Sequence, residues 1–378
     1  MYFLDDDKCC GCSACFNICP KRAISMKKND EGFLYPIIDK NKCVKCGLCE
    51  KVCPVLKQKS SEKITATYAV KNKDDIVRLS SSSGGVFYSL ASYIIKNDGY
   101  VVAATYDDKF NVVHEICDSL DNLNKFMGSK YVQSDLKDNF IKVKKLLDDQ
   151  KVVLFVGTPC QVSGLYSFLK KEYTNLYLVD VICHGVPSPL VYKNYIESIS
   201  ALDKINSISF RNKKTGWQSY SFTISHDKGV FSERAGCNIY FRGFLNDIFL
   251  RKSCYNCQFK LHNKHSDITL GDFWKIQKVN KSFYDNKGVS AVIINSAKGS
   301  TLFDECSSDF IIAGCSLDDI ISGNPSLISA AKFNENRNVF FENIKITNVN
   351  EAIIKSIGNC SVVKKYVFIL LDKLKSIM

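Results

Sequence analysis

After residue 64, short apolar runs alternate along the chain with longer stretches of helical period. Residues 151–156 form an almost continuous apolar run, which is typical of a buried strand. The pattern predicts strands at residues 65–71, 100–106, 112–117, 151–156, 176–182, 268–270 and 289–295, and helices at 84–96, 140–147 and 160–171. Strict alternation at 205–211 and 220–226 predicts a hairpin. Together these elements favour a larger α/β domain with a mixed sheet and flanking helices.

The first sixty residues have a different pattern, because they contain an internal repeat of cysteines. Each copy has three cysteines separated by two residues, then a fourth cysteine after three more residues, followed directly by proline. The two copies are Cys9, Cys12, Cys15, Cys19 and Pro20, then Cys43, Cys46, Cys49, Cys53 and Pro54. This is the spacing of bacterial two-cluster ferredoxins.

The two-residue gaps let three thiolates of one loop converge on one iron–sulfur cubane, while the fourth cysteine points to the other cluster. The predicted ligand sets are Cys9, Cys12, Cys15 and Cys53 for one cluster, and Cys43, Cys46, Cys49 and Cys19 for the other. The alternative is a pair of structural zinc sites, but zinc motifs usually bring two cysteine pairs together. Residues 1–57 therefore resemble an α+β ferredoxin-like domain with two [4Fe–4S] clusters, with small paired strands at 23–26 and 32–38.

Composition narrows the class of protein further. The chain has 378 residues, 18 cysteines, 46% hydrophobic residues and a net charge of +12. No apolar run approaches the roughly 18 residues of a membrane-spanning helix, and the acidic start does not resemble a secretory signal. We therefore expect a cytoplasmic protein with reduced thiols and no transmembrane segment. No nucleic-acid-binding motif accompanies the positive charge, which is compatible with an acidic electron carrier such as ferredoxin or flavodoxin.

A second set of cysteines lies downstream. Cys254 and Cys257 form a C-x-x-C pair, and Cys160 and Cys183 each follow a predicted strand. Since sites in open α/β sheets assemble at the carboxyl ends of strands, these four could hold a third cluster. The alternative is that Cys160 and Cys183 are small buried hydrophobic residues.

Two segments are candidates for binding an anion. Residues 78–85 are rich in serine and end in two glycines before a predicted helix, and residues 157–161 open another helix after a strand. Small residues at a helix start let backbone amides approach a phosphate. Thr158 is the candidate cofactor contact in the second segment. Each segment could instead be an ordinary helix cap.

Several of these segments resemble one known family. The motifs are Ser80-Ser-Ser-Ser-Gly-Gly-Val-Phe87, Gly128-Ser-Lys-Tyr-Val-Gln-Ser134, Gly157-Thr-Pro-Cys-Gln161, Cys183-His-Gly-Val-Pro187 and Ser266-Asp-Ile-Thr-Leu-Gly-Asp-Phe-Trp274. They resemble elements of the coenzyme F420 hydrogenase/dehydrogenase beta-subunit family and occur in family order from about residue 8 to residue 295. Beyond residue 295 the resemblance fades.

The resemblance implies a flavoprotein that holds FAD beside an iron–sulfur cluster. Carried over by position, the FAD contacts are Ser82, Ser83, Gly84 and Gly85, and the residues near the flavin ring or its substrate are Ser129, Lys130 and Gln133. The ligands of the flavin-proximal cluster are Cys160, Cys183, Cys254 and Cys257. His184 and Lys130 are the candidate catalytic acid–base groups. A histidine titrates near neutral pH and could deliver a proton beside the flavin. The alternatives are that His184 orients the turn after the strand and that Lys130 balances a phosphate.

We therefore predict an FAD- and iron–sulfur-dependent oxidoreductase. It would pass electrons between the clusters, FAD and a deazaflavin such as coenzyme F420, a ferredoxin or a small organic substrate. The alternative is an electron-relay subunit that docks to a separate catalytic protein. The predicted parts are a ferredoxin domain at 1–57, an FAD-binding domain at 64–295 and a helical C-terminal extension at 296–378.

Overall fold

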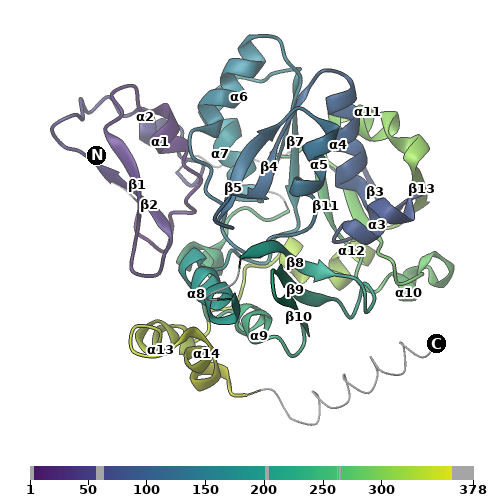
Figure 1. The fold of residues 1–378 in the computed structure, drawn as a ribbon. Helices are drawn as coiled ribbons and strands as arrows, with labels where there is room; N and C mark the ends of the chain where they lie inside the picture. Colours follow the sequence, from purple (N-terminus) through teal and green to yellow (C-terminus); the bar gives the residue numbers. More distant parts are fainter. Residues whose placement is uncertain (1–3, 57–63, 201–203, 262, 264, 360–378) are drawn as a thin grey trace.

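The computed structural model describes residues 4–56, 64–200, 204–261, 263 and 265–359 (Figure 1). The stretch 57–63, which joins the two predicted domains, and the end of the predicted C-terminal extension, 360–378, lie outside this part. Among the described residues, no helix has the length and apolar character needed to cross a membrane.

The N-terminal domain consists of two short helices and one hairpin. The helices are α1 (Ala14–Ile18) and α2 (Leu48–Lys51), and the strands are β1 (Ile24–Lys28) and β2 (Leu34–Ile38). The strands pair antiparallel, with Ile24 opposite Ile38. Each helix follows a residue of positive φ, Ser13 at 59° and Gly47 at 72°, which lets the cysteine loop turn sharply into the helix.

The larger domain is built on a mixed sheet of eight strands in the order β13-β3-β12-β11-β7-β6-β4-β5. The strands are β3 (Ala66–Asn72), β4 (Tyr100–Tyr106), β5 (Val112–Cys117), β6 (Val153–Gly157), β7 (Leu176–Val181), β11 (Ile268–Asp272), β12 (Ser290–Ile294) and β13 (Phe310–Gly314). The four central strands β4, β6, β7 and β11 are parallel, and the outer pairs are antiparallel. The predicted mixed sheet is confirmed.

Helices cover both faces of this sheet. Alternate residues of β6 point to opposite sides, so Leu154 packs with α4 (Val86–Lys96) and α11 (Ala297–Glu305). Phe155 packs on the other face with α6 (Asn139–Asp148) and α7 (Pro159–Leu169). The carboxyl ends of β6, β7 and β11 meet at one edge, because parallel neighbours end on the same side.

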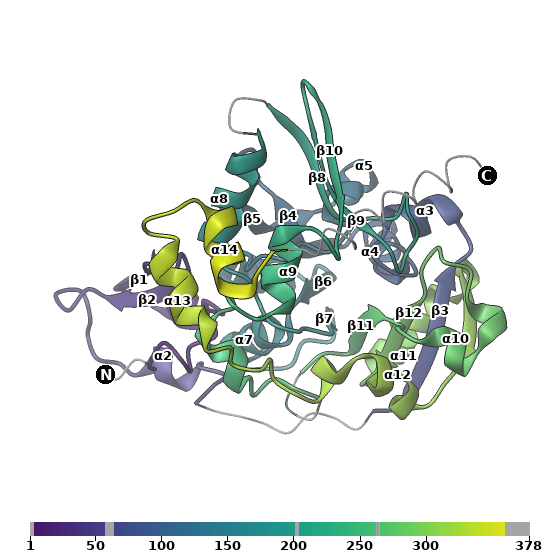
Figure 2. The same cartoon turned by 90° about the horizontal axis from the view of Figure 1, so that it is seen from below.

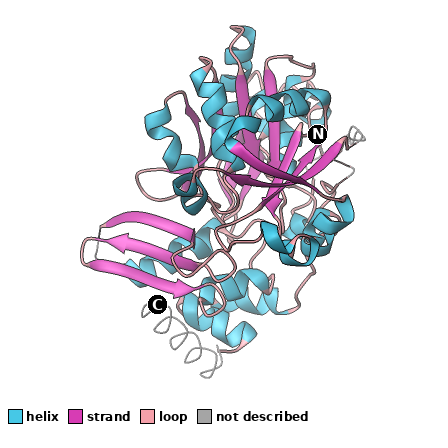
Figure 3. Ribbon diagram, turned by 90° about the vertical axis from the view of Figure 1, so that its right-hand side faces the viewer, coloured by secondary structure: helices cyan, strands magenta, loops and turns pink. Residues whose placement is uncertain are grey.

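A second, smaller layer packs below this edge. It contains the antiparallel sheet β8-β9-β10 and a group of helices that share one hydrophobic cluster (Figures 2 and 3). The strands are β8 (Ile205–Asn212), β9 (Ser221–His226) and β10 (Gly229–Arg234), and the helices are α8 (Pro189–Ser200), α9 (Ile239–Leu245), α13 (Asn336–Asn343) and α14 (Val349–Ile357). The remaining short helices are α3 (Asp75–Ser80), α5 (Leu120–Leu123), α10 (Ile276–Val279) and α12 (Leu317–Gly323).

The predicted boundary after residue 295 falls inside the larger domain. The chain beyond it contributes α11 and the edge strand β13, whose Phe310 pairs with Asn72 of β3. This strand is a short apolar run at the edge of the sheet, where Ile311 and Ile312 are 44% and 37% exposed. A run of this length cannot be told from a helix segment by its periodicity alone. Only the later helices α13 and α14 resemble the expected helical extension.

The N-terminal domain packs directly on the larger domain (Figure 1). Cys10, Cys12 and Ala14 belong to the same hydrophobic cluster as α6 and α7. On its other side, Glu31 of the hairpin turn pairs with the buried Arg337 of α13 through both guanidinium nitrogens. The cysteine loops are therefore held at a fixed position against the sheet.

Candidate functional site

The four downstream cysteines line a single cavity between the two domains. Cys160 lies in the first turn of α7, and Cys183 follows β7 by two residues, so the parallel pairing of β6 and β7 brings them together. Cys254 lies in the short 3-10 helix Lys252–Asn256, and Cys257 follows it. All four line the cavity, together with Cys10 of the first ferredoxin loop.

The electrostatics of this cavity are those of crowded, buried thiols. Burial and the neighbouring thiols of Cys160 and Cys257 raise the pKa of Cys254 to about 12. Burial also raises the pKa of Cys183, and repulsion from the Cys254 thiol raises it as well. Bound iron stabilises thiolates, so ligation would remove this penalty. The donor set therefore fits a metal cluster.

The first ferredoxin loop has the same character. Burial, together with repulsion from the thiols of Cys9 and Cys53, raises the pKa of Cys15 to about 12. Cys53 comes from the second copy of the repeat, so the predicted crossover of the fourth cysteine is present in the geometry. Cys9, Cys12, Cys15 and Cys53 therefore form one mutually repelling group of sulfurs.

The second loop closes around its own cavity. That cavity is lined by Cys19, Cys43, Cys46 and Cys49, the predicted ligands of the other cluster. The backbone amide of Ala23 donates to Cys19 Sγ at 3.2 Å. In the part of the chain that the structure describes, no three His, Cys, Asp or Glu side chains are close enough to hold a single metal ion.

Cys10, which has no place in the ferredoxin motif, connects the first loop to the downstream cysteines. Its side chain is buried, and the neighbouring thiols of Cys12 and Cys160 both shift its pKa, which is raised overall. A side chain built at Gly164 of α7 would lie 2.7 Å from Cys12 Cβ, which shows how closely the loop approaches the helix. The first loop and the downstream cavity are therefore separated by one side chain.

A buried guanidinium holds this contact in place. Arg251 donates to the Cys9 carbonyl at 2.7 Å and to Gln133 Oε1 at 3.0 Å, and its Nη2 lies 3.7 Å from Cys9 Sγ. Gln133 in turn donates to the Cys10 carbonyl at 3.1 Å. Sequence reasoning missed Arg251, whose only signal is its position three residues before Cys254. Gln133 contacts the cysteine loop, and its predicted place near a flavin stays a prediction.

The serine- and glycine-rich segment lies at the start of α4. Ser82 and Ser129, both predicted to contact the flavin, are adjacent, with the Ser129 amide 2.6 Å from Ser82 Oγ. Ser83 and Gly84 bond to β12 instead, and a Cβ at Gly84 would lie 2.3 Å from the Val70 carbonyl. Gly85 has φ 91°, which favours glycine. The glycines thus have a packing role whether or not a cofactor binds.

Two buried cationic side chains that the sequence did not single out, Arg211 and Lys213, lie beside this segment, and its first residue, Arg78, is also buried. Arg211 donates to the Ser82 carbonyl and pairs with Asp272, while Lys213 donates to the Ser83 carbonyl at 2.6 Å. Arg78 pairs with a carboxylate of the larger domain. Small residues at a helix start beside buried cations fit an anionic group such as a flavin phosphate.

Comparison with known proteins agrees with this arrangement. The model of the C-terminal part of the coenzyme F420 hydrogenase/dehydrogenase beta subunit matches residues 150–319, and that of a 4Fe-4S dicluster domain matches residues 8–56. Residues 150–319 of this chain therefore resemble the C-terminal part of that beta subunit. The predicted resemblance, the ferredoxin-like fold and the two-cluster domain are confirmed.

Two further comparisons add little. No curated protein matches the chain. Among solved structures, a chain of the xenon-derivatised F420-reducing [NiFe] hydrogenase complex from Methanosarcina barkeri is 15% identical, with a TM-score of 0.47. That match covers 70% of this chain and 91% of the other.

The remaining predicted residues have defined contacts. His184 lines the downstream cavity, and its Nε2 lies 2.5 Å from Asp247 Oδ1. Lys130 donates to the carbonyls of Phe126 and Met127, and burial lowers its pKa to about 7. Thr158 caps α7. A catalytic role for His184 or Lys130, and a cofactor contact for Thr158, stay predictions.

Proposed function

We propose that this chain is an iron–sulfur flavoprotein oxidoreductase whose N-terminal clusters exchange electrons with FAD in the larger domain. The observation that supports this most is the path of sulfurs from the first ferredoxin loop through Cys10 to the downstream cavity. Iron–sulfur clusters supply one-electron transfer, and a flavin couples it to two-electron chemistry.

The chain's own residues supply binding and orientation. Two clusters would be held by the eight N-terminal cysteines, and a third by Cys160, Cys183, Cys254 and Cys257. FAD would be held by Ser82, Ser83, Gly84, Gly85, Ser129, Lys130 and Gln133. His184 Nε2, oriented by Asp247, could hold or release a proton at the cavity. The acceptor would be a deazaflavin such as coenzyme F420, a ferredoxin or a small organic molecule.

The test is anaerobic purification followed by iron, sulfide and flavin quantitation. We expect about twelve iron atoms and one FAD per chain, from three four-iron sites. Cys254→Ser with Cys257→Ser should remove about four of them. Cys306→Ser with Cys315→Ser is the matched control, because these thiols lie outside the three cysteine groups, and it should keep the full iron content.

About eight irons in the unaltered protein would contradict the third cluster, and absence of bound flavin would contradict the flavin assignment. The alternative, an electron-relay subunit, predicts the same cofactors. It differs in turnover, because reduction of an acceptor would then require addition of a separate catalytic protein.

A further inference from the structure

The two ferredoxin loops differ in what covers them. Cys12 of the first loop is 7% exposed, and Cys10 is 8% exposed. At the corresponding positions of the second loop, Cys46 is exposed and Val44 is 59% exposed. A predicted cluster ligand therefore lies at the surface beside an exposed apolar side chain. We call residues 19–22 and 39–51 the outer loop surface.

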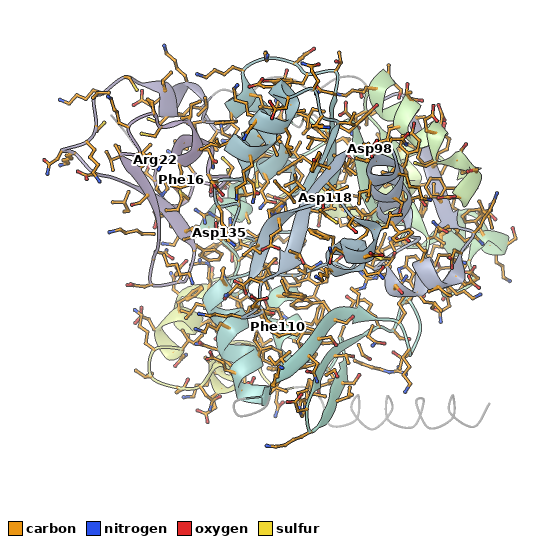
Figure 4. The ribbon with its side chains drawn as sticks, turned by 45° about the horizontal axis from the view of Figure 1, so that its top comes forward. Phe16, Arg22, Asp98, Phe110, Asp118 and Asp135 are labelled. Carbon is orange, nitrogen blue, oxygen red and sulfur yellow. The ribbon has the colours of Figure 1, made fainter. Side chains whose placement is uncertain are left out.

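This surface is strongly basic. Its exposed cationic residues are Lys21, Arg22, Lys40, Lys42, Lys45 and Lys51. It contains only two acidic residues, Asp39 and Glu50, and Asp39 pairs with Lys42 at 3.6 Å. By contrast, the acidic Asp7 lines the downstream cavity. Figure 4 shows Arg22 on the N-terminal domain, at a distance from the sheet.

We propose that the outer loop surface is the docking site for an acidic electron-carrier protein. The proposal rests on the proposed function, because it assigns the cluster predicted at Cys19, Cys43, Cys46 and Cys49 as the point where electrons enter or leave. Basic side chains around an exposed site attract an acidic partner and orient it. Val44 provides a small apolar contact at the centre, which a transient interface needs.

A membrane surface or a nucleic acid would also be attracted by the lysines. The observations favour a protein, because the charges surround a predicted redox site instead of forming an extended basic groove or an amphipathic helix. Contact there would bring a second redox centre close to Cys46.

The experiment measures electron transfer from a reduced, purified acidic ferredoxin to the cluster-loaded protein by stopped-flow absorbance. The variant is Lys40→Glu with Lys45→Glu. Neither lysine lines the cavity formed by Cys19, Cys43, Cys46 and Cys49. We expect its second-order rate constant to fall about tenfold or more at low salt and to depend less on ionic strength. Val44→Ser should lower the rate constant by a smaller factor.

The matched control is Lys278→Glu with Lys281→Glu. These exposed lysines lie at and just after α10, which Figures 1 and 2 place on the opposite side of the molecule from α2. The control should keep the unaltered rate constant. Equal rate constants for both double variants would overturn the proposal.

Two further measurements separate this proposal from the proposed function. Dithionite reduces the protein without docking of a partner. If the cofactors of the larger domain then stay oxidised, the proposed relay is contradicted. The ferredoxin measurement would still report on docking. Binding to duplex DNA or to anionic vesicles is measured with the same variants. If Lys40→Glu with Lys45→Glu weakens either of those and leaves the ferredoxin rate unchanged, the docking proposal is wrong.

Discussion

The two cysteine loops of the N-terminal domain have the same spacing and nearly the same backbone but opposite surroundings. Positions 34 residues apart correspond, so Gly11 at φ 70° matches Lys45 at φ 54°, and Ser13 at φ 59° matches Gly47 at φ 72°. The equivalents of the buried Cys10 and Cys12, however, are Val44 and Cys46 at the surface.

This difference shows that the cysteine motif determines the conformation of each loop. The residues that pack against a loop determine whether it is buried. The spacing requires two left-handed residues in each loop, and non-glycine residues accept that conformation at a cost of about 1 kcal/mol. Burial of the first loop arises from its contact with α7 and with Arg251. The first loop is thus suited to internal transfer, and we propose the second for external exchange.

The largest effect should come from removing the buried guanidinium that holds the first loop. Arg251→Met leaves the carbonyls of Cys9 and Leu34 without their donor, and each unsatisfied buried acceptor costs about 1–3 kcal/mol. We expect a marked fall in the urea midpoint at which the visible cluster absorbance is lost. The reduction potential of the cluster predicted at Cys9, Cys12, Cys15 and Cys53 should also become more negative, because a positive charge near Cys9 Sγ is lost.

Lys45→Met is the control for this prediction, since it removes a positive charge from the corresponding loop without breaking a buried contact. It should leave the urea midpoint almost unchanged. Similar midpoints for the two variants would mean that the two loops are held equally.

A smaller effect should come from adding one methyl group to each loop. In Gly11→Ala the new Cβ would lie 2.9 Å from Arg251 Cζ and 3.0 Å from Gln133 Nε2, whereas Gly47→Ala meets nothing within 4 Å. Both glycines have positive φ, so backbone strain is common to the two variants. Overpacking costs about 1–3 kcal/mol, and we expect that difference between them in thermal unfolding. Equal losses would show that the first loop can move away from Arg251.

The smallest effect should come from pH, through the buried side chain of His114. His114 Nε2 lies 3.0 Å from the Val156 carbonyl and Nδ1 lies 2.9 Å from Ser134 Oγ, next to Gln133. Burial lowers its pKa from 6.5 to about 4. The unfolded chain therefore binds more protons between these pH values, and stability falls as pH falls through this window, by at most about 1.4 kcal/mol per pH unit.

This dependence is measured as the change in thermal midpoint between pH 7 and pH 5, compared with His114→Gln. The variant lacks the titrating ring, so its midpoint should fall less than that of the unaltered protein. Parallel curves for the two proteins would contradict a neutral, buried His114.

Much of the fold was predictable, because its strands are marked by local patterns. The runs at 151–156 and 176–182 identified β6 and β7, and the rule that parallel strands end at one edge placed Cys160 and Cys183 near each other. Edge strand β13 was missed because its short apolar run does not by itself distinguish a strand from part of a helix. The contacts of Gln133 were also missed, since they depend on a residue 118 positions away.

By itself, the sequence determined the two cysteine loops and the alternation of strands and helices, because spacing and periodicity act between near neighbours. The crossed ligand sets that the spacing predicts stay a prediction. Only the tertiary structure decided which loop is buried, that Cys10 lies between Cys12 and Cys160, and that Arg251 joins the two domains. Nearly identical loops carry no local signal of their burial. That depends on which surface packs against α7, and packing is a property of the whole chain.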